Sequence, residues 1–309
     1  MLLRLTFGLG LFVGSMALGW WLNRCGRLTE TQASRLVRWI VTGPSPIVLC
    51  LSFWRMNLFS PEPWLLPLLG LLVSSATLIP AMLYARRAEF SRPQTGSFLT
   101  CAFFSNLGYF GAFTAFALSG EAAYGLCMLY LVFFTPCFYT WGFWVAARYG
   151  KSRKPSVLGA AFRDDLRLYP FVGMFAGVLL SLTRVPRPVA FEWLNHVLIP
   201  LDTALYLIAI GSQVTFESPR PWLRACLVMS AVKFLYTPCV AWALLNLFDI
   251  HGLARRTVLL QASTPVAVSP LVLPLLFGLD RKFSNALWLF TTLLAVPWFV
   301  LIIPALARL

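Results

Sequence analysis

Residues 148–167, RYGKSRKPSVLGAAFRDDLR, form the longest hydrophilic stretch of the chain and divide it into two halves. On both sides of this stretch, apolar runs of about 20 residues follow one another, each long enough to cross a hydrocarbon core about 30 Å thick. Hydrophobic residues make up 59% of the 309 residues and charged residues only 12%, whereas a soluble domain usually carries about 25% charged residues. The sequence therefore predicts an all-α integral membrane protein that is embedded in the lipid bilayer along its whole length.

Ten apolar spans are expected, five before the central stretch and five after it. Their approximate limits are 5 to 23, 37 to 55, 64 to 85, 97 to 118, 122 to 147, 168 to 183, 193 to 213, 222 to 247, 254 to 277 and 283 to 306. The first run is too long for the apolar region of a secretory signal and is followed by Arg24 and Arg27, so we expect it to be retained as a span. This pattern predicts a first five-helix repeat in 1–147, a cytoplasmic linker in 148–167 and a second five-helix repeat in 168–309.

The basic residues gather on one side of these spans. Most of the 25 Lys and Arg residues fall on the side of the central stretch, and the other side holds Arg4, Arg55, Arg184, Arg187, Arg255, Arg256 and Arg308. Because cytoplasmic loops carry the excess of positive charge, this distribution predicts a multi-pass protein of the cell membrane with both termini outside. It also accounts for the formal charge of +14 without a nucleic acid, which we do not expect as a partner.

Two halves of five spans each enter the membrane in opposite orientation if they share a fold, and such inverted repeats are typical of secondary transporters. Weak internal similarity supports this interpretation: SATLIPAMLY (75–84) matches KFLYTPCVAW (233–242) and places Pro80 opposite Pro238. Prolines are common in membrane helices, so a chance alignment is the alternative.

Two segments interrupt regular helix at corresponding places in the fourth and ninth spans. They are CAFFSNLGYFGAF (101–113), with glycines around an asparagine, and LLQASTPVAVSPLVLP (259–274), with three prolines. Each proline removes a backbone donor, and a membrane tolerates such backbone only inside protein or along a wet cavity. Half-helix N-termini at such breaks suit a carboxylate. We therefore expect a substrate site where the segments meet; kinked helices that pack through small residues without a ligand are the alternative. The expected residues are Asn106, Gly108, Ser263, Thr264, Pro265 and Ser269.

Two charged residues lie near the middle of predicted spans, where an ionisable group is costly and needs a reason to be present. Asp202, in the seventh span, is expected to bind a coupling proton or cation. Lys233, in the eighth, is expected to face an anionic substrate or to pair with Asp202. A buried structural ion pair, or a lysine that snorkels towards a helix end, is the alternative.

No other chemistry is indicated by the sequence. The seven cysteines form no CxxC, and the two histidines, His196 and His251, lack a second ligand at helical spacing, so no metal site is expected. Walker, GxSxG and GxGxxG sequences with an acidic partner are absent, so neither ATP-driven transport nor common hydrolase chemistry has support. We expect no enzyme and no cofactor.

Over nearly the whole chain the sequence resembles the auxin efflux carrier family of membrane transport proteins, in a bacterial-type form without the long hydrophilic insertion of many plant members. The similar segments include FFSNLGYFGAFTAFALSGEAAYGLCMLYLV (103–132), LIPLDTALYLIAIGSQV (198–214), KFLYTPCVAWAL (233–244) and QASTPVAVSPLVL (261–273). Asn106, Gly108 and Gly111 fall on the family's Asn-x-Gly-x-x-Gly segment, and Pro46 on a proline of its second helix. The family includes the plant PIN auxin carriers and is related more distantly to the bile-acid sodium symporters.

The resemblance implies two inverted five-helix repeats in which broken helices four and nine cross at the transport site. It further implies alternating-access transport of a small organic anion, auxin-like or a carboxylate, and a homodimer. Phe113, Ser269 and Asp202 depart from the residues usual in the family, which are proline, asparagine and an apolar residue. Two other functions stay open: a sodium- or proton-coupled symporter of the bile-acid type, for which Asp202 and Gln261 are the obvious ion ligands, and a membrane receptor or scaffold without transport.

Overall fold

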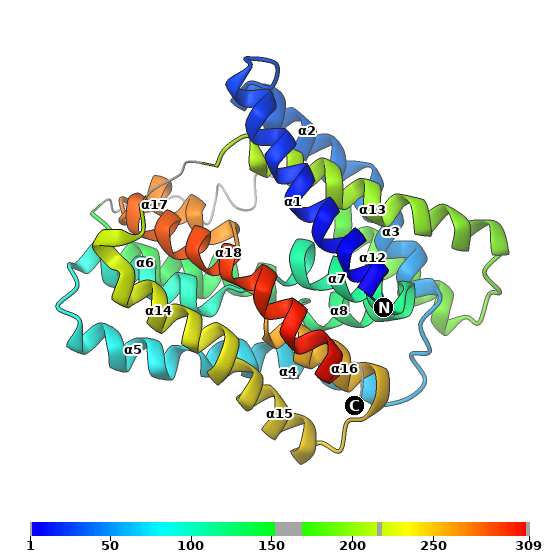
Figure 1. Ribbon diagram of the computed structural model, residues 1–309. Helices are drawn as coiled ribbons and strands as arrows, with labels where there is room; N and C mark the ends of the chain where they lie inside the picture. Colours follow the sequence, from blue (N-terminus) through cyan, green and yellow to red (C-terminus); the bar gives the residue numbers. More distant parts are fainter. Residues whose placement is uncertain (1, 152–168, 215–217, 307–309) are drawn as a thin grey trace. The chain divides into compact units, whose positions relative to one another are not determined.

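The computed structural model describes residues 2–151, 169–214 and 218–306 (Figure 1). Within these ranges the chain is helical and forms no strand beyond one isolated β-bridge. The predicted all-α class is therefore confirmed. Most of the predicted linker, residues 152–167, lies outside the described residues.

Helical elements occupy each of the ten predicted ranges. Before the linker they are α1 (Leu2–Arg24), α2 (Glu30–Thr42), α3 (Pro44–Trp54), α4 (Glu62–Ala76), α5 (Leu78–Arg87), α6 (Arg92–Phe103), η1 (Leu107–Ala112), α7 (Phe113–Ser119), α8 (Glu121–Tyr130), α9 (Phe134–Cys137), η2 (Phe138–Gly142) and α10 (Phe143–Tyr149). After it they are α12 (Tyr169–Leu182), α13 (Val189–Gly211), η4 (Arg220–Trp222), α14 (Leu223–Ala231), η5 (Val232–Tyr236), α15 (Thr237–Leu247), α16 (Gly252–Ala262), η6 (Ser269–Leu271), α17 (Val272–Phe277) and α18 (Arg281–Leu306).

Among the described residues, 6 helical stretches are long and apolar enough to cross a membrane. They are Glu30–Trp54, Glu62–Arg87, Glu121–Tyr149, Val189–Gly211, Arg220–Leu247 and Arg281–Leu306. Leu107–Ser119 and Tyr169–Leu182 are apolar but shorter. These helices make the chain a multi-pass membrane protein.

Prolines explain why several of these stretches are not regular α-helices. Pro238 cannot donate to the carbonyl four residues earlier, and the chain forms the π-helical turn η5 just before it. The Thr237 hydroxyl donates to the Val232 carbonyl, 2.6 Å away, and satisfies one of the acceptors in this turn. The matching Pro80 follows a break at Thr77, whose hydroxyl donates to the Ser74 carbonyl at 2.6 Å. A threonine hydroxyl therefore satisfies a backbone carbonyl in the irregular turn before each of the two prolines.

Contacts between Cα atoms divide the chain into two compact units. The first unit contains Met1–Trp64, Gly108–Met128 and Phe162–Val214; the second contains Leu65–Leu107, Leu129–Ala161 and Thr215–Leu309. Each unit therefore combines helices from both halves of the sequence.

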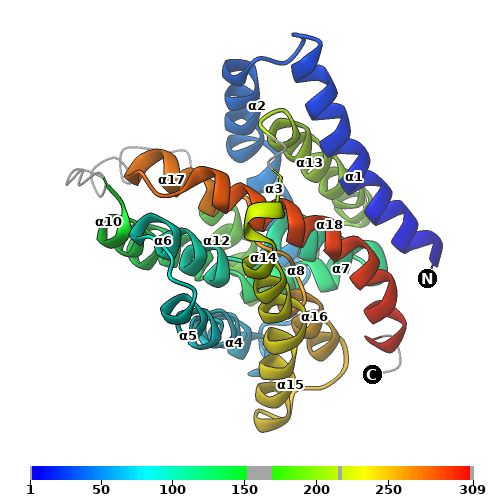
Figure 2. The same ribbon diagram turned by 60° about the vertical axis from the view of Figure 1, so that its left-hand side comes forward.

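Glycines bring the helices of the first unit into close contact. In α12, Gly173 and Gly177 form a GxxxG pair that packs on α3, where an added Cβ would lie 2.1 Å from the Pro46 carbonyl oxygen and 2.3 Å from that of Cys50. Helices α1 and α13 lie side by side in Figures 1 and 2 and are packed in the same way through Gly19 and Gly211. Such small residues let membrane helices approach closely enough for van der Waals packing to hold them together.

The variant Gly177→Ala is therefore expected to be less stable than the native protein by about 1–3 kcal/mol, because the methyl group must push the α3 backbone away. The measurement is thermal unfolding in detergent. Gly14→Ala in α1 is the matched control, since a Cβ there meets nothing within 4 Å. Equal unfolding midpoints for the two variants would contradict the close packing of α3 on α12.

Helix α6 lies at the centre of the second unit. Every residue from Gly96 to Phe103 is buried, and the helix packs against α5, α10 and α18 (Figure 2). At its C-terminal end, Phe103 and the following Phe104 join a buried cluster with Phe138, Phe143 and Phe277. This packing fixes the position at which α6 ends.

Candidate functional site

Residues 101–107 of the first predicted interruption and the second predicted interruption, 259–274, lie side by side in the second unit. Helix α6 ends at Phe103 and α16 ends at Ala262, and the chain after each is extended. Ser105 and Val266 form an antiparallel bridge. Around it, the Asn106 N–H donates to the Pro265 carbonyl at 2.8 Å, and the Ala267 N–H donates to the Phe104 carbonyl at 3.0 Å. The backbone groups freed by the two breaks thus satisfy one another inside the protein, as a membrane requires.

We call the paired stretches 104–106 and 265–267 the crossing. Three side-chain hydroxyl groups form further hydrogen bonds at or next to it. The Val266 N–H donates to the Thr291 hydroxyl of α18 at 3.3 Å. The Ser263 hydroxyl donates to the Leu259 carbonyl at 2.9 Å, and the Thr264 hydroxyl donates to the Gln261 carbonyl at 2.7 Å. Ser263 and Thr264, the two predicted site residues that directly follow α16, are buried, and their hydroxyl protons are used to satisfy carbonyls at the end of that helix. Only their oxygen lone pairs remain for a ligand.

Lys233 reaches the crossing from the π-helical turn η5. Its side chain is fully buried, and Nζ donates to the Ala102 carbonyl at 2.6 Å and to the Ser105 hydroxyl at 2.7 Å. The ammonium group therefore lies at the C-terminal end of α6, where unpaired carbonyls carry partial negative charge.

Two buried polar side chains flank the extended part of the second segment. Gln261, in the last turn of α16, is 0% exposed, and among the described residues neither its Oε1 nor its Nε2 has a hydrogen-bond partner. The buried Ser269 hydroxyl, at the start of η6, also has no partner among them. Leaving such a group unpaired costs about 1–3 kcal/mol, so native proteins keep few of them, and a bound water, an ion or a ligand is a common partner for those that remain.

The predicted coupling residue lies in the first unit. Asp202, in α13, is 4% exposed and accepts a hydrogen bond from the Ser45 hydroxyl of α3 at 2.7 Å. One turn further along α13, Tyr206 stacks on Tyr109, with ring centroids 3.6 Å apart and planes 11° from parallel. Gly108, a predicted site residue, directly precedes Tyr109 and is the first residue of the stretch Gly108–Met128 of the first unit. A Cβ added at Gly108 would meet no atom within 4 Å, so this glycine is not required by close packing.

A buried charge cluster in the first unit is absent from the sequence-based predictions. Glu121 begins α8, and its carboxylate side chain is 0% exposed. The Arg187 guanidinium forms a two-pronged ion pair with it, and the Asn195 amide also donates to it. Arg55 lies 3.5 Å from the same carboxylate and pairs with Glu192; the hydrogen bond to Glu192 raises the pKa of Arg55 above its usual value. The cluster joins the turn before α8 to α3 and α13.

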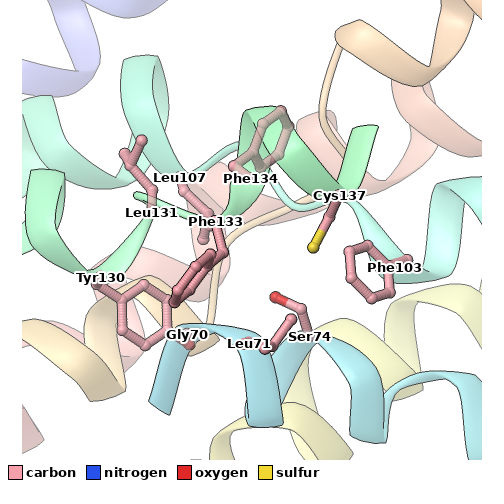
Figure 3. A pocket seen from close by; sticks show the side chains of 10 residues that line it. All are labelled: Gly70, Leu71, Ser74, Phe103, Leu107, Tyr130, Leu131, Phe133, Phe134 and Cys137. Carbon is pink, nitrogen blue, oxygen red and sulfur yellow. The ribbon is translucent and has the colours of Figure 1, made fainter. Parts of the chain in front are cut away.

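A narrow apolar crevice with a volume of about 10 Å³ lies in the second unit where α4, the end of α6 and the break between α8 and α9 meet (Figure 3). Its lining residues are Gly70, Leu71, Ser74, Phe103, Leu107, Tyr130, Leu131, Phe133, Phe134 and Cys137. The Ser74 hydroxyl and the Cys137 thiol point into it. Small-molecule sites usually have about 300–1,000 Å³, so this crevice is too small for a substrate and has room for about one water molecule.

The described residues contain no group of three or more His, Cys, Asp or Glu side chains that could hold a metal ion. Apart from Lys233, the polar side chains at the crossing are amides and hydroxyls, and such groups suit hydrogen bonding or a hard cation rather than zinc.

The comparison with protein families decides the class of this membrane protein. The model of the membrane transport protein family matches residues 11–303. The chain belongs to this family. The resemblance to the auxin efflux carrier family is thereby confirmed, and so is a role in membrane transport at the level of the family.

Two archaeal proteins are similar to the chain. One, an uncharacterized transporter of Methanocaldococcus jannaschii, is 25% identical over 208 residues, which is 64% of this chain and 64% of that protein. The other, an uncharacterized transporter of Methanothermobacter thermautotrophicus, is 23% identical over 280 residues, 90% of this chain and 91% of that protein. The first match thus spans less than two thirds of that relative.

Proposed function

We propose that this membrane transport protein is a carrier of a small organic anion, auxin-like or a carboxylate, that works by alternating access. The observation that carries the proposal is the buried Gln261 amide, for which the described part of the chain offers no hydrogen-bond partner, together with a crossing that already holds a buried ammonium group. A carboxylate would accept hydrogen bonds from the Gln261 Nε2–H and from the Ser269 hydroxyl, and Lys233 supplies a positive charge at the same crossing. The ligand would thus satisfy groups whose burial otherwise destabilises the protein.

The proposed site also contains Asn106, Ser263, Thr264 and Pro265, which line the crossing, and Gly108, which follows it. Their backbone is already paired, so they would shape the site rather than supply its main donors. Uncharged donors and one lysine are sufficient for a monovalent anion, because charge-assisted hydrogen bonds are about twice as strong as neutral ones.

We extend the proposal to the whole chain: ten spans in two inverted five-helix repeats, residues 1–147 and 168–309, joined by a cytoplasmic linker, with both termini outside the cell membrane. The mixing of sequence halves in each compact unit supports interlocked repeats. A homodimer is proposed from the family resemblance alone.

The test is flux of a panel of small carboxylates and indole acids into proteoliposomes, with and without proton and sodium gradients. Saturable flux of at least one anion is expected. Absence of flux across the panel, with protein that unfolds cooperatively, would exclude an organic-anion carrier; binding without flux would favour a receptor or scaffold.

Asp202 gives a separate prediction about coupling. Asp202→Asn keeps the side-chain volume and an acceptor for the Ser45 hydroxyl but removes the negative charge. We expect uptake driven by a proton gradient to fall to the level without a gradient, while exchange of labelled for unlabelled anion continues. Flux of the variant is compared with that of Ser45→Ala, which keeps the carboxylate. Unchanged gradient dependence in Asp202→Asn would show that this carboxylate does not couple transport.

A further inference from the structure

Two helical arms of the crossing, α6 and α16, end there with their C-termini. Helix α6 has 12 residues and ends at Phe103; helix α16 has 11 residues and ends at Ala262. Each helix C-terminus carries about half a negative charge from carbonyls without intrahelical partners. Two such ends, joined by the bridge between Ser105 and Val266, favour a cation next to their carbonyl groups.

The chain itself supplies that cation. The Lys233 ammonium donates hydrogen bonds to one carbonyl oxygen and one hydroxyl oxygen. Oxygen atoms of these kinds are also the ligands that a small hard cation binds in proteins. In the described part of the second unit no carboxylate lies within 4 Å of Nζ. The positive charge of Lys233 is therefore stabilised by neutral dipoles and by the partial negative charge of the helix ends. The lysine is also 0% exposed and cannot snorkel to the membrane surface.

We propose that the crossing is a monovalent-cation site and that the Lys233 ammonium occupies it permanently, in place of a free coupling cation. The ammonium has three N–H donors, and the Ala102 carbonyl and the Ser105 hydroxyl use two of them. The third is left for water or for the substrate anion. The lysine therefore acts as a positioning residue that cancels the negative helix ends and makes the crossing acceptable to an anion.

The role assigned to the third N–H rests on the proposed anion transport, whereas the cation site itself does not. Two consequences separate this arrangement from a sodium symporter. Anion flux through the native protein is independent of sodium, and removing the ammonium creates a vacant site with oxygen ligands that an added cation of suitable size can enter.

The experiment compares the native protein with Lys233→Ala and Lys233→Met, and with Lys282→Ala, an exposed lysine at the start of α18, as the control. Thermal unfolding in detergent and anion flux in proteoliposomes are measured while ethylammonium, propylammonium, sodium or N-methylglucamine is added at constant ionic strength. Lys233→Met, which keeps most of the side-chain volume but cannot admit a cation, keeps the test interpretable if the alanine variant folds poorly.

The expected result is flux at least about tenfold lower in both Lys233 variants, the loss of one charge-assisted hydrogen bond. In Lys233→Ala alone, propylammonium or ethylammonium restores flux and raises the unfolding midpoint, and N-methylglucamine does neither. If no small cation changes the midpoint of Lys233→Ala, or if Lys233→Met transports as well as the native protein, the proposal is overturned. A midpoint restored by alkylammonium when even the native protein moves no anion would support the cation site and count against the carrier function instead.

Discussion

Replacing Gln261 by Met is expected to make the protein more stable and nearly inactive. The native amide is fully buried with neither polar atom paired among the described residues, so its removal should recover about 1–3 kcal/mol of stability. If the same amide donates to the substrate anion, flux should fall by about 10- to 100-fold, the value of one or two hydrogen bonds to a charged group. The two effects are measured on one preparation, by thermal unfolding in detergent and by flux in proteoliposomes.

A second buried donor provides the control for this variant. The Trp298 Nε1–H of α18 is also buried and unpaired in the described structure, but Trp298 lies outside the proposed site residues. Trp298→Phe is expected to leave flux close to the native level. Ser269→Ala, which removes the other unpaired group beside the crossing, should lower flux as Gln261→Met does. Native flux in both Gln261→Met and Ser269→Ala would remove the main support for the proposed substrate site.

The pattern of apolar runs and prolines was sufficient to predict the helical elements and the places where two of them break. Asn106 with its neighbouring glycines, and Pro265 with Pro270, mark interruptions that the structure places next to each other. This worked because a proline or glycine in a membrane helix has a local effect on the backbone that needs no knowledge of the rest of the chain.

Features that depend on distant residues could not be predicted in the same way. Gln261 was recognisable only as a potential ion ligand, because its lack of a partner depends on everything that packs around α16. The spatial units also escape the sequence pattern, since residues 65–107 pack with 215–309 rather than with the helices that precede them. Glu121 was overlooked because it lies between two predicted spans, where a carboxylate is ordinarily solvated. Its neighbours in the sequence, Gly120 and Ala122, give no sign that Arg187 approaches it from 66 residues away.

The variant Arg187→Met is expected to destabilise the protein more than any other single change in the first unit. It leaves the fully buried Glu121 carboxylate with the Asn195 amide and with Arg55 at 3.5 Å, and breaking one partner out of a buried ion pair costs about 3–5 kcal/mol. The fluorescence-detected unfolding midpoint in detergent should fall clearly, and the yield of folded protein should fall with it.

A double-variant cycle tests whether this loss comes from the unpaired charge. Adding Glu121→Gln to Arg187→Met removes the buried charge while keeping an acceptor for Asn195, so the double variant should be more stable than Arg187→Met alone. Glu192→Gln is the control: it removes the exposed partner of Arg55, and water already screens that pair, so little change is expected. Additive losses from Glu121→Gln and Arg187→Met would mean that the two side chains do not stabilise one another. A double variant that regains stability would instead show that the turn before α8 is held in the first unit by compensation of charge, which apolar packing can partly replace.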